Sequence, residues 1–317
     1  MRYLLIGANG LIGRSLLRAL AADSTVADDS VTVLDITPRP SHLLPPETAR
    51  FSWLQGDVLD FANLERVVVE RKTTGIVLLA GLLLSETAAD PLHAVKINTS
   101  GLLHCLELAK LHALQQVVWC SSVQVYGSAP YYGGEGVWVD ENSPKRPESL
   151  YGNCKDFCES LAAFYHKTKG VNSVGLRFST VIGHGRTSGS NTYFCDTIEN
   201  AARGQSSVLP YGDHLNNFVY VTDAARAILT CMQAKTFPSL IYNICAEKLY
   251  TNREVAGIIS GIVPEVSIPC TPGDTEAKAT PFSKPDKFIR EMNFTYQYPL
   301  PVALQDYINI VQHTTKG

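Results

Sequence analysis

The chain has 317 residues, of which 45% are hydrophobic and 18% are charged, and its formal net charge is −3. These values are ordinary for a globular enzyme, and the absence of a basic run argues against nucleic acid or an anionic membrane as a partner. No apolar stretch approaches the ~20 residues of a membrane-spanning helix, and the first predicted strand leaves no room for a signal peptide, so we expect a cytoplasmic protein. The eight cysteines form no Cys-x-x-Cys pair, which predicts reduced thiols and no metal site.

The N-terminus combines a short strand, a glycine-rich turn and a helix. Residues 3–6 are an apolar run typical of a buried strand, and apolar residues at helical spacing follow over 11–22. In the turn, the first glycine permits a tight bend, the second lets backbone N–H groups approach a pyrophosphate, and the third allows the helix to pack on the strand. The segment therefore predicts a dinucleotide site, with a plain tight turn as the alternative. Its residues are Gly7, Asn9, Gly10, Leu11, Ile12 and Gly13.

Two acidic residues follow the next predicted strands. Asp35 ends the apolar run 31–34, about 20 residues past the last glycine, where a carboxylate binds the adenosine ribose and repels a 2′-phosphate. This favours NAD over NADP, although Arg39 lies nearby in the sequence. Asp57, followed by Val58, is placed either to accept from the adenine amino group or to cap the helix that starts near Phe61.

Strands and helices alternate through the first half of the chain. Strands are predicted at 3–6, 31–34, 51–54, 75–80, 116–121 and 173–178, and helices at 11–22, 61–71, 91–112 and 151–168. This order predicts an α/β fold with a doubly wound parallel Rossmann sheet. Residues 1–178 would form the NAD-binding domain, joined by segments that return within about 216–245, including strands at 218–221 and 240–244. Residues 179–317 would form a smaller, mixed substrate-binding lobe.

Tyr151 and Lys155 stand four residues apart on the helix predicted at 151–168. They would therefore share one helix face, where the ammonium favours the ionised phenol. Such a tyrosine can exchange a proton with a substrate hydroxyl, and a serine from the strand end at Ser121 and Ser122 can hold the substrate oxygen. The pattern predicts a proton relay for oxidising an alcohol or reducing a ketone, with a solvated helix face as the alternative.

Several motifs occur together in a fixed order. They are Gly-x-x-Gly-x-x-Gly at 7–13, Gly-Asp at 56–57, Asn98, Ser-Ser-x-x-Val-Tyr-Gly at 121–127, Tyr-Gly-x-x-Lys at 151–155, Leu-Arg-Phe at 176–178 and Phe-Val-Tyr-Val at 218–221. In this order they resemble the extended short-chain dehydrogenase/reductase family, also called the NAD-dependent epimerase/dehydratase family. The resemblance covers residues 1–245 clearly and the remainder loosely.

The resemblance implies a role for each matching position. Tyr151 would be the general acid/base, Lys155 would bind the nicotinamide ribose and tune Tyr151, and Ser122 rather than Ser121 would be the catalytic serine. Ala80 and Gly81 match the small residues beneath the cofactor. Asn98 would be either a hydrogen-bonding residue on the cofactor side or a helix cap.

Some positions depart from the nucleotide-sugar epimerases of this family. Where those enzymes carry an asparagine and an arginine that hold the sugar nucleotide, this chain has Thr180 and Asn216. Losing the arginine removes the natural bidentate partner of a pyrophosphate. Arg186, Arg203 and His214 lie in the same lobe. They either substitute for the missing arginine or are surface residues.

The loop after Gly81 resembles a different branch, whose members oxidise small substrates such as L-threonine or sugar acids. In those relatives a serine of this loop touches the substrate, which suggests Ser85; its alternative is to cap a helix near 86–96. We therefore expect an NAD-dependent oxidoreductase acting on a secondary hydroxyl of a sugar or sugar-like compound. The alternatives are a nucleotide-sugar epimerase that retains NAD, an L-threonine or sugar-acid dehydrogenase and, remotely, a non-catalytic NAD-binding protein.

The resemblance also implies a homodimer, formed by pairing the helices near 91–112 and 151–168. Apolar residues on these helices are candidates for the interface, although packing within one chain would use the same side chains. They are Leu102, Leu103, Leu106 and Ala109 on the first helix and Leu161, Ala162 and Phe164 on the second.

Overall fold

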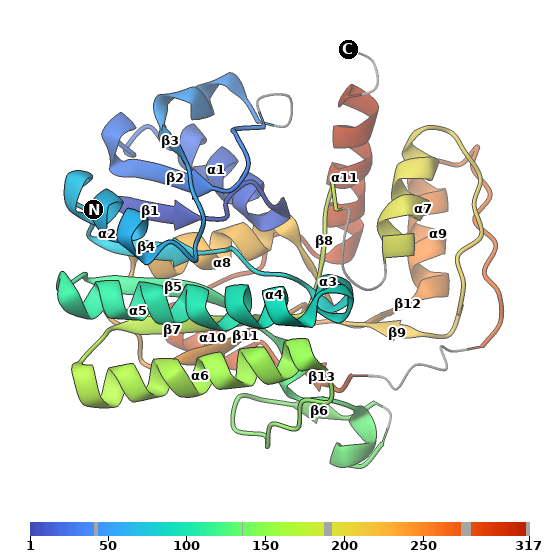
Figure 1. Ribbon diagram of the computed structural model, residues 1–317. Helices are drawn as coiled ribbons and strands as arrows, with labels where there is room; N and C mark the ends of the chain where they lie inside the picture. The colour runs from blue at the N-terminus through green and yellow to red at the C-terminus, as the bar shows by residue number, and fades with distance from the viewer. Residues whose placement is uncertain (41–43, 135, 187–191, 274–279, 315–317) are drawn as a thin grey trace.

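A computed structural model describes residues 1–40, 44–134, 136–186, 192–273 and 280–314 of the chain. Its centre is a seven-stranded parallel sheet in the order β11-β7-β5-β4-β1-β2-β3 (Figure 1). The predicted Rossmann-type α/β architecture is confirmed. The strands are β1 (Tyr3–Ile6), β2 (Val31–Asp35), β3 (Ser52–Gln55), β4 (Gly75–Leu78), β5 (Gln116–Ser122), β7 (Ser173–Phe178) and β11 (Ile241–Ile244).

Helices cover both faces of the sheet, as right-handed crossovers between parallel strands require. One face packs against α1 (Leu11–Ala22), α8 (Val221–Gln233) and α10 (Asp286–Met292). The other packs against α2 (Phe61–Glu70), α5 (Gly101–Leu111) and α6 (Leu150–Lys169). The strand order reverses between β1 and β4, so a ligand crevice is expected where the carboxyl ends of these strands separate.

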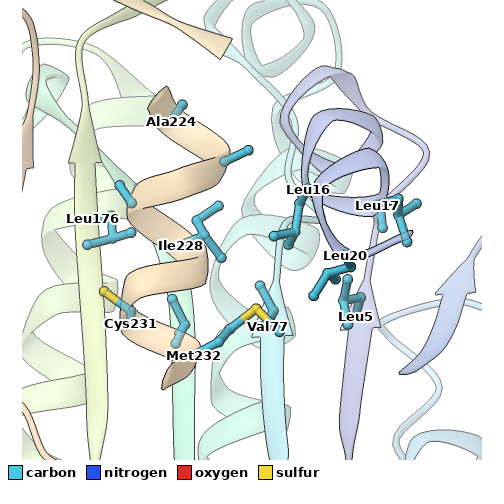
Figure 2. Close-up of a cluster of buried hydrophobic side chains, with 14 of the residues drawn as sticks. Leu5, Leu16, Leu17, Leu20, Val77, Leu176, Ala224, Ile228, Cys231 and Met232 are labelled. Carbon is cyan, nitrogen blue, oxygen red and sulfur yellow. The ribbon is translucent and has the colours of Figure 1, made fainter. Parts of the chain in front are cut away.

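The hydrophobic core between the sheet and the helices α1 and α8 explains why these two helices cover one face of the sheet. Figure 2 shows leucines of α1 and apolar residues of α8 meeting side chains of β1, β4 and β7. In α1 the buried leucines are Leu16, Leu17 and Leu20, which recur at helical spacing and therefore face the sheet together. Because these strands are buried on both faces, they read as continuous apolar runs rather than alternating ones.

A second, smaller core lies in the C-terminal part of the chain. There α7 (Thr192–Ala202), α9 (Asn252–Ile262) and α11 (Leu300–Thr314) pack with β8 (Thr180–Ile182) and β10 (Phe218–Tyr220). Two two-stranded sheets belong to this region, β8 with β10 and β9 (Leu215–Asn216) with β12 (Tyr250–Thr251). A third, β6 (Trp138–Val139) with β13 (Phe282–Ser283), lies away from these helices in Figure 1. Figure 1 shows the three helices standing beside one end of the large sheet.

One predicted strand return is wrong and the other is confirmed. The strand predicted at 218–221 does not rejoin the main sheet, because β10 pairs in parallel with β8 instead. The strand predicted at 240–244 does rejoin it, as β11 beside β7. Of the segments expected to return within 216–245, β11 joins the large sheet and α8 packs on one of its faces. β9 and β10 belong to small separate sheets.

The helix predicted at 91–112 is divided. It consists of α4 (Pro91–Val95), a π-helical turn (Lys96–Ser100) and α5, and it is preceded by a short α3 (Leu84–Ala89). Asp90 caps α4 by accepting from the His93 N–H. The helix predicted at 151–168 is one continuous α6, capped by Ser149, whose hydroxyl accepts from the Gly152 N–H.

All eight cysteines are free thiols, and six of them are buried in the packed layers. Cys231 of α8 lies in the core between α1, α8 and the sheet, Cys105 of α5 lies in the core on the other face, and Cys195 lies in the C-terminal core. Across the described residues, no group of three or more His, Cys, Asp or Glu side chains could hold a metal ion. The same part of the chain contains no helix that is both long and apolar enough to cross a membrane.

Candidate active site

The glycine turn follows β1, at the edge where the strand order reverses. Gly7 has φ +81°, and a side chain there would place its Cβ 2.4 Å from the Ala80 backbone nitrogen. A Cβ at Gly13 would lie 2.4 Å from the Ala8 carbonyl oxygen, so both glycines are required by packing. A Cβ at Gly10 would meet only the Gly7 oxygen, at 3.6 Å. The open space at Gly10 is what a pyrophosphate on the N-terminus of α1 needs.

Asp35 stands at the end of β2 beside this turn. Its carboxylate accepts from the Asn9 N–H at 3.0 Å and from the N–H and hydroxyl of Thr37 at 3.1 and 3.0 Å. Arg39 is engaged elsewhere: it donates to Pro45 O and Thr48 Oγ1, and its guanidinium lies 5.5 Å from the centre of the Trp53 ring. The charge next to the predicted ribose position is therefore negative, which disfavours a 2′-phosphate.

The predicted relay residues come together on β5 and α6. The Lys155 ammonium donates to the Cys120 carbonyl at 2.8 Å and lies 5.6 Å from the centre of the Tyr151 ring. Tyr151 is 8% exposed, and Ser122 ends β5, where its hydroxyl accepts from the Gln124 N–H at 3.2 Å. The expected shared face of Tyr151 and Lys155 is present because α6 is regular through both residues.

Lys155 is buried but keeps its charge. Burial disfavours the ammonium, whereas the neighbouring Tyr151 and the thiols of Cys158, Cys120 and Cys154 favour it, and the net effect raises the pKa of Lys155. The lysine therefore remains a cation at neutral pH, hydrogen bonded to the carboxyl end of β5.

A single cavity of about 500 Å³ joins the glycine turn to the predicted relay residues. Of the predicted cofactor and substrate residues, those that line it come from the turn, from the end of β4, from β5 and α6, and from β8. They are Gly7, Asn9, Gly10, Leu11, Ile12, Gly13, Gly81, Ser122, Tyr151, Lys155 and Thr180. The carboxyl ends of separate strands thus converge on one space, as the rule for open α/β sheets requires.

Other predicted cofactor residues lie behind the lining or away from it. Asn98 is buried and holds the loop after β4, since its amide accepts from the Leu82 N–H at 3.0 Å and donates to the Leu82 carbonyl at 2.9 Å. It lies inside the π-helical turn rather than at a helix start, so the cap alternative is wrong. Ala80 packs against Gly7, and Val58 is buried against Gly101.

Asp57 is exposed at the end of the segment after β3. Its carboxylate accepts from the Leu59 N–H at 2.9 Å. The cap of α2 is Asp60, which accepts from the Asn63 N–H, so the alternative of a helix cap at Asp57 is wrong. The predicted adenine contact of Asp57 stays a prediction.

Two predicted substrate residues lie outside the cavity lining. Ser85 is exposed within α3, although its neighbours Leu84 and Glu86 line the cavity. Ser85 does not cap this helix, because the helix starts at Leu84 and Glu86 accepts from the Leu83 N–H at 2.7 Å. Asn216 is buried, and its amide donates to Asn252 Oδ1 at 2.6 Å.

Three further charged residues line the cavity. Arg14 and Glu86 were not predicted from the sequence, whereas Arg186 was predicted to be either a substitute for the missing arginine or a surface residue. Arg14 donates to Asn9 O at 2.7 Å and to Gly185 O at 3.1 Å, and it ties the glycine turn to the segment after β8. Arg186 donates to Val181 O at 2.6 Å, and Glu86 also lines the cavity. One sequence signal was available for Arg14: a cation in the first turn of a helix opposes the helix dipole unless an anion binds there.

Comparisons with known proteins agree with this geometry. The model of the NAD dependent epimerase/dehydratase family matches residues 3–245. A UDP-glucose 4-epimerase from Lacticaseibacillus casei is 26% identical over 295 residues, which cover 87% of this chain and 86% of that protein. The mitochondrial L-threonine 3-dehydrogenase of Bos taurus is 26% identical over 276 residues, covering 84% of this chain and 70% of that protein.

Solved structures give the same result for the fold. The holo form of an L-threonine dehydrogenase from Cupriavidus necator superimposes with a TM-score of 0.83 at 26% identity, over 99% of this chain and all of that chain. The family match spans the glycine turn, the relay residues and β11. The chain therefore belongs to the NAD-dependent epimerase/dehydratase family and is an NAD-dependent enzyme of the extended short-chain dehydrogenase/reductase type.

Proposed function

We propose that this enzyme is an oxidoreductase that transfers a hydride to or from a secondary hydroxyl carbon of a sugar or sugar-like substrate. The observation that supports it most is the single cavity lined both by the glycine turn and by Ser122, Tyr151 and Lys155. When bound, NAD supplies the hydride acceptor or donor at this cavity.

The three side chains divide the handling of the proton. Tyr151 accepts the proton of the substrate hydroxyl as the hydride leaves the same carbon, and returns it when a ketone is reduced. The Lys155 ammonium, which the Cys120 carbonyl keeps in place, would hold the nicotinamide ribose when NAD is bound, and its positive charge beside the Tyr151 ring assists the proton transfer. The Ser122 hydroxyl holds the substrate oxygen next to Tyr151.

The surroundings favour a substrate without a nucleotide handle. Asn216 stands where the epimerases of this family carry an arginine, and its amide is occupied by Asn252 Oδ1 and the carbonyls of His214 and Tyr250. It therefore offers no charge to a diphosphate. The cavity of about 500 Å³ must also take part of the cofactor, which leaves a limited volume for the substrate.

A nucleotide-sugar epimerase that retains NAD is the second candidate. Arg14 and Arg186 both line the cavity, and guanidinium groups are well suited to bind a diphosphate. An L-threonine or sugar-acid dehydrogenase is the third, because an L-threonine 3-dehydrogenase is among the similar proteins. A protein that only binds NAD would not need the complete set of Ser122, Tyr151 and Lys155.

Absorbance in the NADH band distinguishes these candidates. Purified protein is mixed with NAD and, in turn, with D-galactose, D-galacturonate, L-threonine and UDP-glucose. We expect NADH to accumulate with the sugar, D-galactose. Accumulation with L-threonine alone or with D-galacturonate alone would identify the L-threonine or the sugar-acid dehydrogenase. An isomerised UDP-sugar without net NADH would identify the epimerase, and no reaction in the whole panel would contradict the proposed oxidoreductase.

A homodimer is supported by apolar side chains that this chain leaves uncovered. Leu102, Leu106, Ala109 and Ala162, proposed from the sequence for the interface, are buried in the chain's own core. Phe157 and Phe164 on α6, seven residues apart, are instead 54% and 53% exposed, and Leu103 on α5 is partly exposed. Figure 1 shows α5 and α6 side by side at the front of the sheet, so these side chains can meet a second copy.

Substituting Phe157 tests this interface. The wild-type protein is expected to have the mass of a dimer in light scattering, and Phe157→Glu is expected to have the mass of a monomer, because an unpaired carboxylate would be buried between the copies. Val69→Glu, on the exposed surface of α2, is the control and should leave the dimer intact. A wild-type monomer would contradict the proposal.

A further inference from the structure

A buried ion pair lies directly behind the relay. Arg177 of β7 and Glu159 of α6 are both buried and form two parallel hydrogen bonds, Nε to Oε1 and Nη2 to Oε2, each 2.7 Å long. This bidentate geometry fixes both side chains more firmly than a single contact would. Neither residue lines the cavity.

The same carboxylate holds a residue of the strand that carries the catalytic serine. The Ser121 hydroxyl donates to Glu159 Oε1 at 2.8 Å, and the Lys145 ammonium lies 3.1 Å from Oε2. Burial opposes the charge of Glu159, but Arg177, Lys145 and Ser121 outweigh it and lower the pKa of this carboxyl. Glu159 is therefore an ionised acceptor at neutral pH and fixes the hydroxyl of Ser121 as a donor.

Two hydrogen bonds consequently join the end of β5 to α6. Lys155 reaches the Cys120 carbonyl, and Glu159, one helical turn further along, reaches the next residue, Ser121. Tyr151, Lys155 and Glu159 are spaced four residues apart and follow one side of α6. Ser122 comes immediately after this doubly held segment.

We propose that Glu159 is a positioning residue for the relay, acting through Ser121 to hold Ser122 at a fixed distance from Tyr151. The inference rests on the proposed roles of Ser122, Tyr151 and Lys155. Without the Glu159–Ser121 bond, the Lys155–Cys120 bond is the remaining one of these two hydrogen bonds, and the end of β5 is held less firmly relative to Tyr151. Small displacements of reacting groups reduce rates strongly, even when binding persists.

A double-mutant cycle between Ser121 and Glu159 tests the inference. Glu159→Gln, Ser121→Ala and the double variant are assayed with the panel substrate that wild-type protein turns over, and with NADH as the binding probe. Each single variant is expected to lose roughly tenfold in kcat, with KM and the NADH Kd changed less than about twofold. The double variant should be no slower than the slower single variant, because both changes act on the same bond: Ser121→Ala deletes its donor, and Glu159→Gln replaces its charged acceptor with a neutral amide.

Two further variants separate positioning from a loss of stability. Ser121→Thr keeps the hydroxyl and is expected to retain most of the wild-type kcat. Asp223→Asn alters another buried carboxylate, one that accepts from Arg226 and from the Tyr298 N–H, and should lower Tm without changing kcat. Asp223 belongs to α8 and does not line the cavity of the relay.

The outcomes distinguish this inference from the proposed function. Wild-type kcat in Ser121→Ala, or losses that multiply to about a hundredfold in the double variant, would overturn the positioning role alone. Full activity of Tyr151→Phe would overturn the relay and the positioning role with it. Non-additive losses together with an inactive Tyr151→Phe would support both.

Discussion

Replacing Tyr151 with phenylalanine is expected to remove turnover almost completely and to leave NAD binding nearly unchanged. The substitution deletes only the hydroxyl that we propose exchanges the proton, and general acid–base groups contribute about 10²–10⁴ in rate. The ring would still fill its buried place, and Lys155 would still be held by the Cys120 carbonyl. The measurements are kcat with the panel substrate and NADH affinity by fluorescence titration.

Tyr165→Phe is a matched control for this experiment. Tyr165 lies on the same helix as Tyr151 and is equally exposed at 8%, but its hydroxyl donates to Glu107 at 2.7 Å, outside the cavity. We expect its kcat to equal that of the wild type, with only a small loss of stability. Equal losses of turnover and NADH binding in Tyr151→Phe would contradict the assigned role of Tyr151 and indicate a structural one.

Replacing Arg177 with leucine is expected to cost about 3–5 kcal/mol of the free energy of unfolding. The carboxylate of Glu159 would stay buried, with only Lys145 and Ser121 to compensate its charge. Adding Glu159→Leu to this variant should recover part of the loss, because the uncompensated charge is then removed. Urea denaturation followed by circular dichroism measures both variants.

An exposed ion pair is the control for this substitution. Arg66 and Glu70 pair at 2.8 Å on the surface of α2, with side chains 57% and 53% exposed. Arg66→Leu should therefore cost less than about 1 kcal/mol, since such pairs are screened by solvent. If Arg177→Leu cost no more than Arg66→Leu, the buried pair would not be a main support of the β5, β7 and α6 packing.

The large sheet was predictable because its signals are local. Runs of apolar residues between glycines and polar turns are followed by amphipathic helices. This alternation predicts where the strands lie and that right-handed helical crossovers connect them in parallel. Which strand a short, three-residue strand pairs with cannot be predicted from such local signals. β8 starts only two residues after β7, so the chain leaves the large sheet at Ser179, and β10 then pairs with β8.

The candidate site likewise has residues that local sequence patterns predict and residues that they do not. The spacing of Tyr151 and Lys155 predicts one shared face of one helix, while Ser122 at the end of β5 was selected over Ser121 by the resemblance to the family. Whether a side chain faces the cavity depends on where an element begins. The start of α3 at Leu84 leaves Ser85 exposed while Glu86 lines the cavity. Arg186 lines it through the path of the chain after β8, for which the sequence shows no periodicity.

The distribution of the cysteines makes each packed layer separately observable by thiol alkylation. Cys105, Cys195 and Cys231 lie in three different cores, and burial raises the pKa of each thiol, that of Cys105 to about 12. Such thiols react with iodoacetamide only when their layer opens, because the reagent needs both access and the thiolate. Mass-resolved labelling rates would therefore report the opening free energy of each layer within one unmodified chain.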